Sequence, residues 1–178
     1  IGKTGVEPCR HRNQLVLDFT RKEVVDHIFA AVSNILSVYE ISYVKWDFNR
    51  SISEFYSQTL GSFQGAFAYK YMLGVYDLAE RLTAAFPDVF FEGCAGGGGR
   101  FDAGMLYYFP QVWTSDNTDA YERARIQWGT SLCFPVSSMS CHVSACPNHW
   151  TGRTTPLSTR GAVASLGAFG YELDLTKL

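Results

Sequence analysis

The chain alternates between short apolar runs, typical of buried strands, and longer segments in which apolar residues recur every three or four positions, typical of amphipathic helices. The apolar runs predict strands at 15–19, 41–47, 89–92, 111–115, within 134–143 and at 171–175. The helical spacing predicts helices at about 20–36, 66–86 and 104–109, from 120 onward, and at 158–169. Strands that alternate with helices favour a parallel sheet with crossover helices.

Residues near the expected helix ends sharpen these boundaries. Thr20 with Glu23 three positions later forms a capping-box pattern, and Asp119 with Glu122 forms another. Pro87 is expected to end the second helix, because proline cannot continue one. The buried stripe of that helix is predicted to be Phe67, Tyr71, Val75, Leu78 and Leu82. In the first helix, the polar side is expected to include His27 at the surface.

The strand at 41–47 ends in a cluster of polar side chains. Alternation along a strand places Lys45, Asp47 and Asn49 on one side, which favours a functional site. The structural alternative is that Asp47 forms an ion pair with Lys45 or Arg50.

A second strand, at 111–115, also ends in acids. Asp119 occupies a helix N-cap position, whereas Asp116 lies at the strand exit without such a role, so Asp116 is the better catalytic candidate. Paired carboxylates at strand ends suit glycoside hydrolysis, and acids at the carboxyl ends of parallel strands are typical of a barrel mouth. About six strands in 178 residues fall short of the eight strands and roughly 250 residues of a closed (β/α)8 barrel. The expected fold is α/β, a partial (β/α)8 TIM barrel.

Three motifs resemble the α-galactosidases of glycoside hydrolase family 36 over nearly the whole chain. They are Lys45-Trp46-Asp47-Phe48-Asn49-Arg50, Cys94-Ala95-Gly96-Gly97-Gly98-Gly99-Arg100-Phe101-Asp102 and Trp113-Thr114-Ser115-Asp116-Asn117-Thr118-Asp119. The resemblance implies that residues 1–178 are a catalytic barrel segment, approximately strands 3 to 8, incomplete at its N-terminal side. Two positions depart from the family: Phe48 stands where many relatives carry Met, and Ala95 where many carry Ser.

The resemblance also assigns roles. It implies that Asp47 is the nucleophile and Asp116 the acid/base of a retaining double displacement that releases α-galactose from sugars such as melibiose and raffinose. Asp116 then needs a less solvated setting, such as Trp113 could give. The implied galactose contacts are Arg12, Lys45, Trp46, Asn49, Cys94 and Gly97.

Several of these assignments have alternatives. The alternative for Trp46 is that its indole packs in the core. The alternative for Arg12 is that it forms a surface ion pair. His149 and Trp150, on a loop near the expected mouth, could reach an aglycone or be structural. The alternative activity is galactosyl transfer of the raffinose-synthase or stachyose-synthase type, and the non-enzymatic alternative is an inactive sugar-binding fragment.

The net charge and the length of the apolar runs argue against nucleic acid and membranes as partners. A net charge of -2 gives no basic field for nucleic acid or an anionic membrane, and no apolar run reaches transmembrane length. The glycine run at 96–99 lacks the Lys-Ser/Thr of a phosphate-binding loop, so it does not predict nucleotide binding. Its glycines either let the backbone approach a ligand closely or form a flexible turn. No cofactor is expected. Family analogy implies a homo-oligomer in the full-length protein.

The five cysteines are odd in number and scattered, which favours reduced thiols in a cytoplasmic enzyme over a disulfide framework. The chain starts without Met and without a signal-peptide pattern. One cluster could suggest zinc, Cys141, His142, Cys146 and His149, but its spacing matches none of the usual paired-ligand patterns. No metal is therefore expected.

Overall fold

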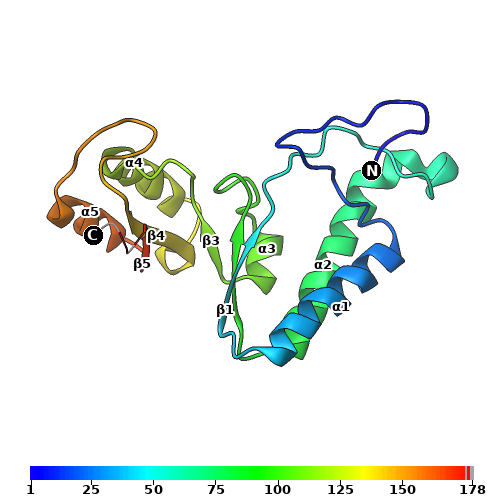
Figure 1. Ribbon diagram of the computed structural model, residues 1–178, viewed down its shortest axis with the longest axis horizontal. Helices are drawn as coiled ribbons and strands as arrows, with labels where there is room; N and C mark the ends of the chain where they lie inside the picture. The colour runs from blue at the N-terminus through cyan, green and yellow to red at the C-terminus, as the bar shows by residue number, and fades with distance from the viewer. Residues whose placement is uncertain (175, 177–178) are drawn as a thin grey trace. The chain divides into compact units, whose positions relative to one another are not determined.

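The computed structural model describes residues 1–174 and 176 and forms two compact units (Figure 1). Unit 1 comprises residues 1–44 and 50–90, and unit 2 comprises residues 45–49 and 91–178. Each unit has its own buried core and is described by itself.

Unit 1 is built on two helices, α1 (Lys22–Val38) and α2 (Phe67–Ala85), which pack side by side (Figure 1). A 3-10 helix, η1 (Gly61–Ala66), leads directly into α2. All five residues predicted for the buried stripe of α2 are buried, which confirms that prediction. His27 is exposed on α1, also as predicted.

The segment 15–19 is the main departure from the predicted elements, because it forms a loop and not a strand. Val16 and Phe19 are buried while Leu15 and Leu17 remain about half exposed. A Cβ at Gly74 of α2 would overlap the Phe19 carbonyl oxygen, so glycine lets this loop lie directly on the helix. Apolar residues here are buried by a helix surface without strand pairing.

The predicted start of α1 is also wrong. Thr20 does not cap the helix, because its hydroxyl donates to the Asp18 carboxylate at 2.6 Å. The N-cap is Arg21, which makes no side-chain capping bond. Local side chain to side chain bonding therefore competes successfully with the capping box.

Within the described residues, one sheet contains five strands in chain order. They are β1 (Tyr43–Asp47), β2 (Phe90–Cys94), β3 (Gln111–Trp113), β4 (Met139–Ser144) and β5 (Ala168–Glu172). The pairs β2–β3, β3–β4 and β4–β5 are parallel, with Gly93 opposite Val112 and Trp113 opposite Ser140. The connecting elements after β2 are α3 (Ala103–Tyr108), α4 (Ala120–Ser131), η2 (Val136–Ser138) and α5 (Leu157–Ala164). Consecutive parallel strands with crossover helices confirm the predicted partial (β/α)8 barrel.

The last helix and strand begin earlier than predicted. A Cβ at Gly167 would lie 2.6 Å from the Cys141 sulfur and 2.7 Å from the Met139 carbonyl oxygen, so the chain after α5 runs against β4 and enters β5 at Ala168. The strand predicted at 171–175 is thus shifted, and its final residue, Leu175, lies outside the described residues.

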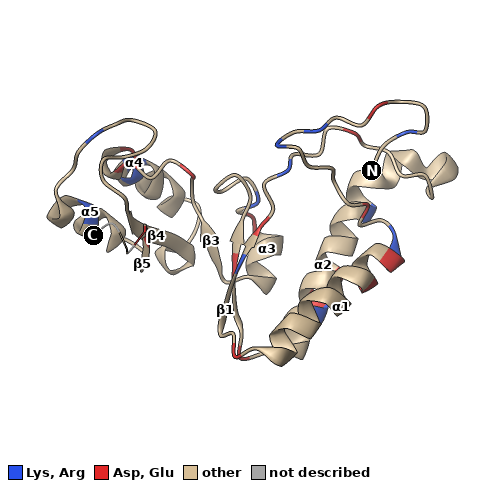
Figure 2. Ribbon diagram, in the orientation of Figure 1, with Lys and Arg blue, Asp and Glu red and all other residues tan. Residues whose placement is uncertain are grey.

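Charged groups form local pairs rather than a field of one sign. At the start of α1, where Figure 2 shows blue and red segments together, Lys22 and Asp26 pair at 2.6 Å. Among the helices that the structure describes, none combines the length and the apolar character needed to cross a bilayer.

Candidate active site

Asp47 lies at the end of β1, exposed and held by its neighbour. The Asn49 side-chain amide donates to Asp47 Oδ2, and Asn49 Oδ1 accepts from the Gly96 amide at 2.6 Å. In addition, the Phe48 amide donates to the Cys94 carbonyl at 2.7 Å. Asn49 thereby orients the Asp47 carboxylate and attaches the end of β1 to the glycine loop after β2.

The glycine loop in turn lies against the strand exit that carries Asp116. A Cβ at Gly97 would be 2.5 Å from Ser115 Cα and 2.8 Å from the Asp116 nitrogen. Gly97 also has φ +80°, a conformation that L side chains rarely adopt. Both facts require glycine at this position, and together they connect the ends of β1 and β3 through one tight loop. The glycine run is therefore a structured turn.

Arg123 of α4 supports the strand that leads to Asp116. Its guanidinium donates to the Ser115 carbonyl at 3.0 Å and the Ser140 carbonyl at 2.9 Å, and contacts the Thr114 hydroxyl. Burial lowers the pKa of Arg123 to about 10, although the negative charges of nearby groups, Asp116 among them, act to raise it. Arg123 thus remains a cation that fixes the backbone on either side of this strand exit.

Lys45 enters an extensive polar network. Its ammonium lies 3.0 Å from Glu172 Oε2, 3.9 Å from Glu92 Oε1 and 4.3 Å from the centre of the Trp113 ring. Within unit 2, Lys45 thus has these two acids as ion-pair partners, and the Asp47 carboxylate has the Asn49 amide. Arg50 donates, within unit 1, to the Cys9 carbonyl at 2.6 Å.

Cys94 is a neutral thiol beside these charges. Burial raises its pKa to about 11, and the negative charge of Asp47 acts in the same direction while the Lys45 ammonium opposes it. A thiol in this state is a weak polar contact and a poor nucleophile.

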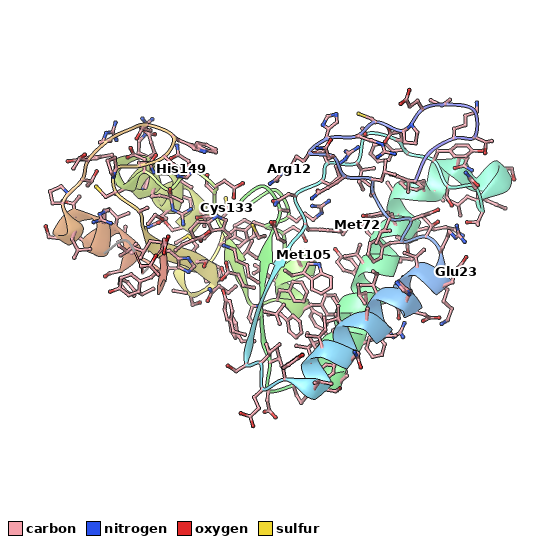
Figure 3. All side chains as sticks on the ribbon, viewed as in Figure 1. Arg12, Glu23, Met72, Met105, Cys133 and His149 are labelled. Atoms are coloured by element: carbon pink, nitrogen blue, oxygen red, sulfur yellow. The ribbon has the colours of Figure 1, made fainter. Side chains whose placement is uncertain are left out.

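Two further predicted sugar contacts, Trp46 and Arg12, are described within their own units. Trp46 alternates to the other face of β1, where its ring lies 6.4 Å from that of Phe109. Arg12 belongs to unit 1, where it is exposed at a tight turn between His11 and Gln14 with φ 55° (Figure 3). The roles of both residues in sugar binding stay predictions.

Trp113 was expected to provide an apolar setting for Asp116. Its buried ring instead packs against cations and an imidazole: Lys45, Arg123 at 4.2 Å and His142 at 4.8 Å. It therefore supports the polar network.

Asp119 is the N-cap of α4, as predicted, and accepts from the amides of Tyr121 and Glu122. It also accepts from the Thr151 hydroxyl at 2.5 Å and the Arg153 guanidinium at 2.7 Å. This anchors the loop after β4 that presents His149 (Figure 3) and the exposed Trp150.

The candidate zinc cluster does not form a metal site in the described residues, where no three His, Cys, Asp or Glu side chains are grouped suitably. His142 bonds to Ser140 and Glu172, and the Cys146 thiol to the Thr155 carbonyl at 3.6 Å. The five cysteines are free thiols.

Sequence reasoning assigned no role to Glu92 or Glu172, and it considered His142 only as a candidate zinc ligand. Each is a polar residue within or at the end of a strand, and Glu92 is completely buried among apolar neighbours in its strand sequence. A charged residue in a buried strand is rare unless it is paired, so this pattern was the available signal.

A parallel βα sheet with carboxylates at the carboxyl ends of its strands, here β1 and β3, is the arrangement of barrel-type glycoside hydrolases. Comparison with known proteins gives the family: the melibiase family model matches residues 1–178, and the chain belongs to this family.

Curated relatives share more than half of their aligned residues with this chain. Alpha-galactosidase Mel36A of Lactobacillus acidophilus is 56% identical over 175 residues, which are 98% of this chain and 24% of the relative. Alpha-galactosidase AgaA of Geobacillus stearothermophilus is 56% identical over 168 residues, which are 94% of this chain and 23% of the relative. The chain thus spans about a quarter of the length of these relatives.

A solved structure has the same fold. The crystal structure of a GH36 AgaA variant from Geobacillus stearothermophilus in complex with raffinose superposes with a TM-score of 0.96 and 53% identity, covering 99% of this chain and 25% of that one. Another variant of the same enzyme, in complex with stachyose, has a TM-score of 0.95.

Proposed function

We propose that the full-length protein carrying this chain hydrolyses terminal α-galactosides of the melibiose and raffinose type with retention of configuration. The observation that carries the proposal is the link from Asp47 through Asn49 to the glycine loop, whose Gly97 lies against the backbone of Asp116. The relatives named alpha-galactosidases, and the relatives solved with raffinose and stachyose, support the substrate class.

In this mechanism Asp47 attacks the anomeric carbon while Asp116 donates a proton to the departing oxygen, so that a galactosyl ester forms and the aglycone leaves as an alcohol. Asp116 then takes a proton from water, and the resulting hydroxide equivalent releases galactose and regenerates Asp47. Retention requires the two carboxyl groups to lie about 5 to 5.5 Å apart in the working enzyme. Neither step uses a metal or cofactor.

Other residues would hold the sugar. Lys45 and Asn49 offer charged and amide donors to hydroxyl groups, the Gly97 amide and the Cys94 thiol are further candidates, and Arg12 and Trp46 remain proposed contacts. Family membership supports these assignments.

The decisive test is hydrolysis of an aryl α-galactoside by the full-length enzyme and its Asp47→Asn variant. We expect kcat to fall at least about a thousandfold, because an amide cannot form the ester intermediate. Asp88→Asn, at an exposed position in unit 1, is the matched control and should keep normal turnover. A loss of less than tenfold in Asp47→Asn would remove Asp47 from its role.

The same preparation separates hydrolysis from transfer. With an aryl α-galactoside as donor and sucrose as acceptor, hydrolysis releases free galactose, whereas transfer to sucrose forms a new trisaccharide. We further propose a cytoplasmic homo-oligomer; cell fractionation and analytical ultracentrifugation of the full-length protein test these two points.

A further inference from the structure

A closed circuit of polar contacts surrounds the Lys45 ammonium. Glu172 Oε2, 3.0 Å from Lys45, also accepts from His142 Nδ1 at 3.1 Å. His142 Nε2 lies 3.0 Å from the Ser140 hydroxyl, which lies 3.0 Å from Glu92 Oε2. The second oxygen of Glu92 returns to Lys45 at 3.9 Å.

The circuit joins β1, β2, β4 and β5, and β3 completes it. Gln111 of β3 donates to Glu92 at 2.8 Å and to Ser140 at 3.1 Å. The Trp113 ring, also on β3, packs against both Lys45 and His142. Every strand of the sheet thus contributes a side chain to the surroundings of one ammonium group.

The members of the circuit differ in exposure. The side chain of Glu92 is 0% exposed and that of Lys45 27%, whereas that of Glu172 is 46% exposed. Lys45 therefore extends from a closed interior toward solvent, with Glu172 at the open side. The Ser140 side chain is buried, so this part of the circuit is closed to water.

We propose that Glu172, oriented by His142, is a positioning residue that holds the Lys45 ammonium in place to contact the galactosyl group of the substrate. This inference rests on the proposed function. Lysine has a flexible stem with several rotatable bonds, and fixing its end before the sugar arrives reduces the entropy that binding must remove.

The charge on Glu172 suits this role. Hydrogen bonds from His142 and Lys45, together with their positive charges, lower the pKa of Glu172 to about 2 despite its partial burial. The carboxylate is therefore ionised throughout the neutral range and always available to Lys45.

The test uses the full-length enzyme with Glu172→Gln, which keeps the shape of the side chain and removes its charge. We expect KM for an aryl α-galactoside and the dissociation constant of free galactose, measured calorimetrically, to rise together by about 10-fold or more, the usual worth of a charge-assisted hydrogen bond. The value of kcat should change less than about threefold. Glu80→Gln, on the exposed side of α2 in unit 1, is the matched control and should match the wild type.

A crystal structure of the full-length Glu172→Gln enzyme gives a readout independent of turnover. The inference requires the Lys45 ammonium to leave its place over Trp113 or to become mobile. An unmoved Lys45 with unchanged galactose affinity would overturn it, as would a variant that loses kcat alone. Wild-type enzyme that binds galactose but cleaves no galactoside would instead overturn the proposed function.

Discussion

At the scale of single residues, Gly97 has the strictest requirement in the candidate site. It combines a positive φ with direct contact to the backbone that leads into Asp116. Gly97 has no side chain that could contact the substrate. Its role is to let the backbone of the glycine loop contact the backbone at Ser115. Its effect on catalysis would come through the position of Asp116.

We therefore expect Gly97→Ala to lower both stability and activity. The left-handed conformation alone costs a non-glycine residue about 1–2 kcal/mol, and the added methyl group must also displace the backbone at Ser115. The free energy of unfolding from denaturant titration and kcat/KM of the full-length enzyme should both fall.

Gly161→Ala is the matched control, because a Cβ there meets nothing within 4 Å inside helix α5. This change should leave activity intact and stabilise the helix by roughly 0.5–1 kcal/mol. Equal effects of the two alanine variants would contradict the role given to Gly97.

At the scale of elements, the stability of helix α4 depends more on the contacts at its N-terminus than on a buried apolar stripe. Its buried positions include Arg123 and Gln127, which are polar. Asp119 compensates by capping the helix and by holding the loop after β4 through Thr151 and Arg153. Burial raises the pKa of Asp119, but these hydrogen bonds and the Arg153 charge outweigh it and keep the pKa below its usual value.

Replacing Asp119 with alanine should cost about 2 to 4 kcal/mol of unfolding free energy, since a cap and a charge-assisted hydrogen bond are lost together. Asp102→Ala removes a simpler cap, a single 2.9 Å bond from the Met105 amide to the Asp102 carboxylate, and should cost only about 1 kcal/mol. Chemical denaturation of both variants measures the difference. Similar losses would show that the loop contacts of Asp119 contribute nothing to stability.

Local patterns predicted the elements that bury a complete stripe or carry a strong cap. The five regularly spaced apolar residues of α2 and the cap at Asp119 are of this kind. The loop at 15–19 was mistaken for a strand because a short run with four apolar residues does not show what buries them. In this case the surface of α2 at Gly74 does so, some 55 residues later in the chain.

At the scale of the whole molecule, the polar circuit around Lys45 could not be predicted, because its members are distant in sequence. Lys45 and Glu172 are separated by 127 positions. The motifs around Asp47 and Asp116 located the two acids at strand exits, since each motif is continuous. Which acids face Lys45 depends on the order and register of five strands.

The low pKa of Glu172 predicts a pH dependence of stability. Its carboxyl group changes from the ordinary value of 4.5 to about 2 on folding. The stabilisation is therefore present above pH 4.5 and is lost as the pH falls toward 2. The difference in unfolding free energy between the wild type and Glu172→Gln should shrink across this window.

Denaturant titrations at several pH values measure this difference. The Glu80→Gln curve should superimpose on that of the wild type, because Glu80 is exposed. Parallel wild-type and Glu172→Gln curves between pH 4.5 and 2 would contradict the assignment of the low pKa to Glu172.

The distance along the chain between Lys45 and Glu172 also sets an order of events during translation. At about 5 to 20 residues per second, a ribosome needs some 6 to 25 s to add the 127 residues that separate them. Once Glu92 has been added, 47 residues after Lys45, it is the one acid of the circuit that is available to the nascent lysine until Glu172 is made. Strand β5 thus completes the surroundings of a side chain made much earlier, in β1.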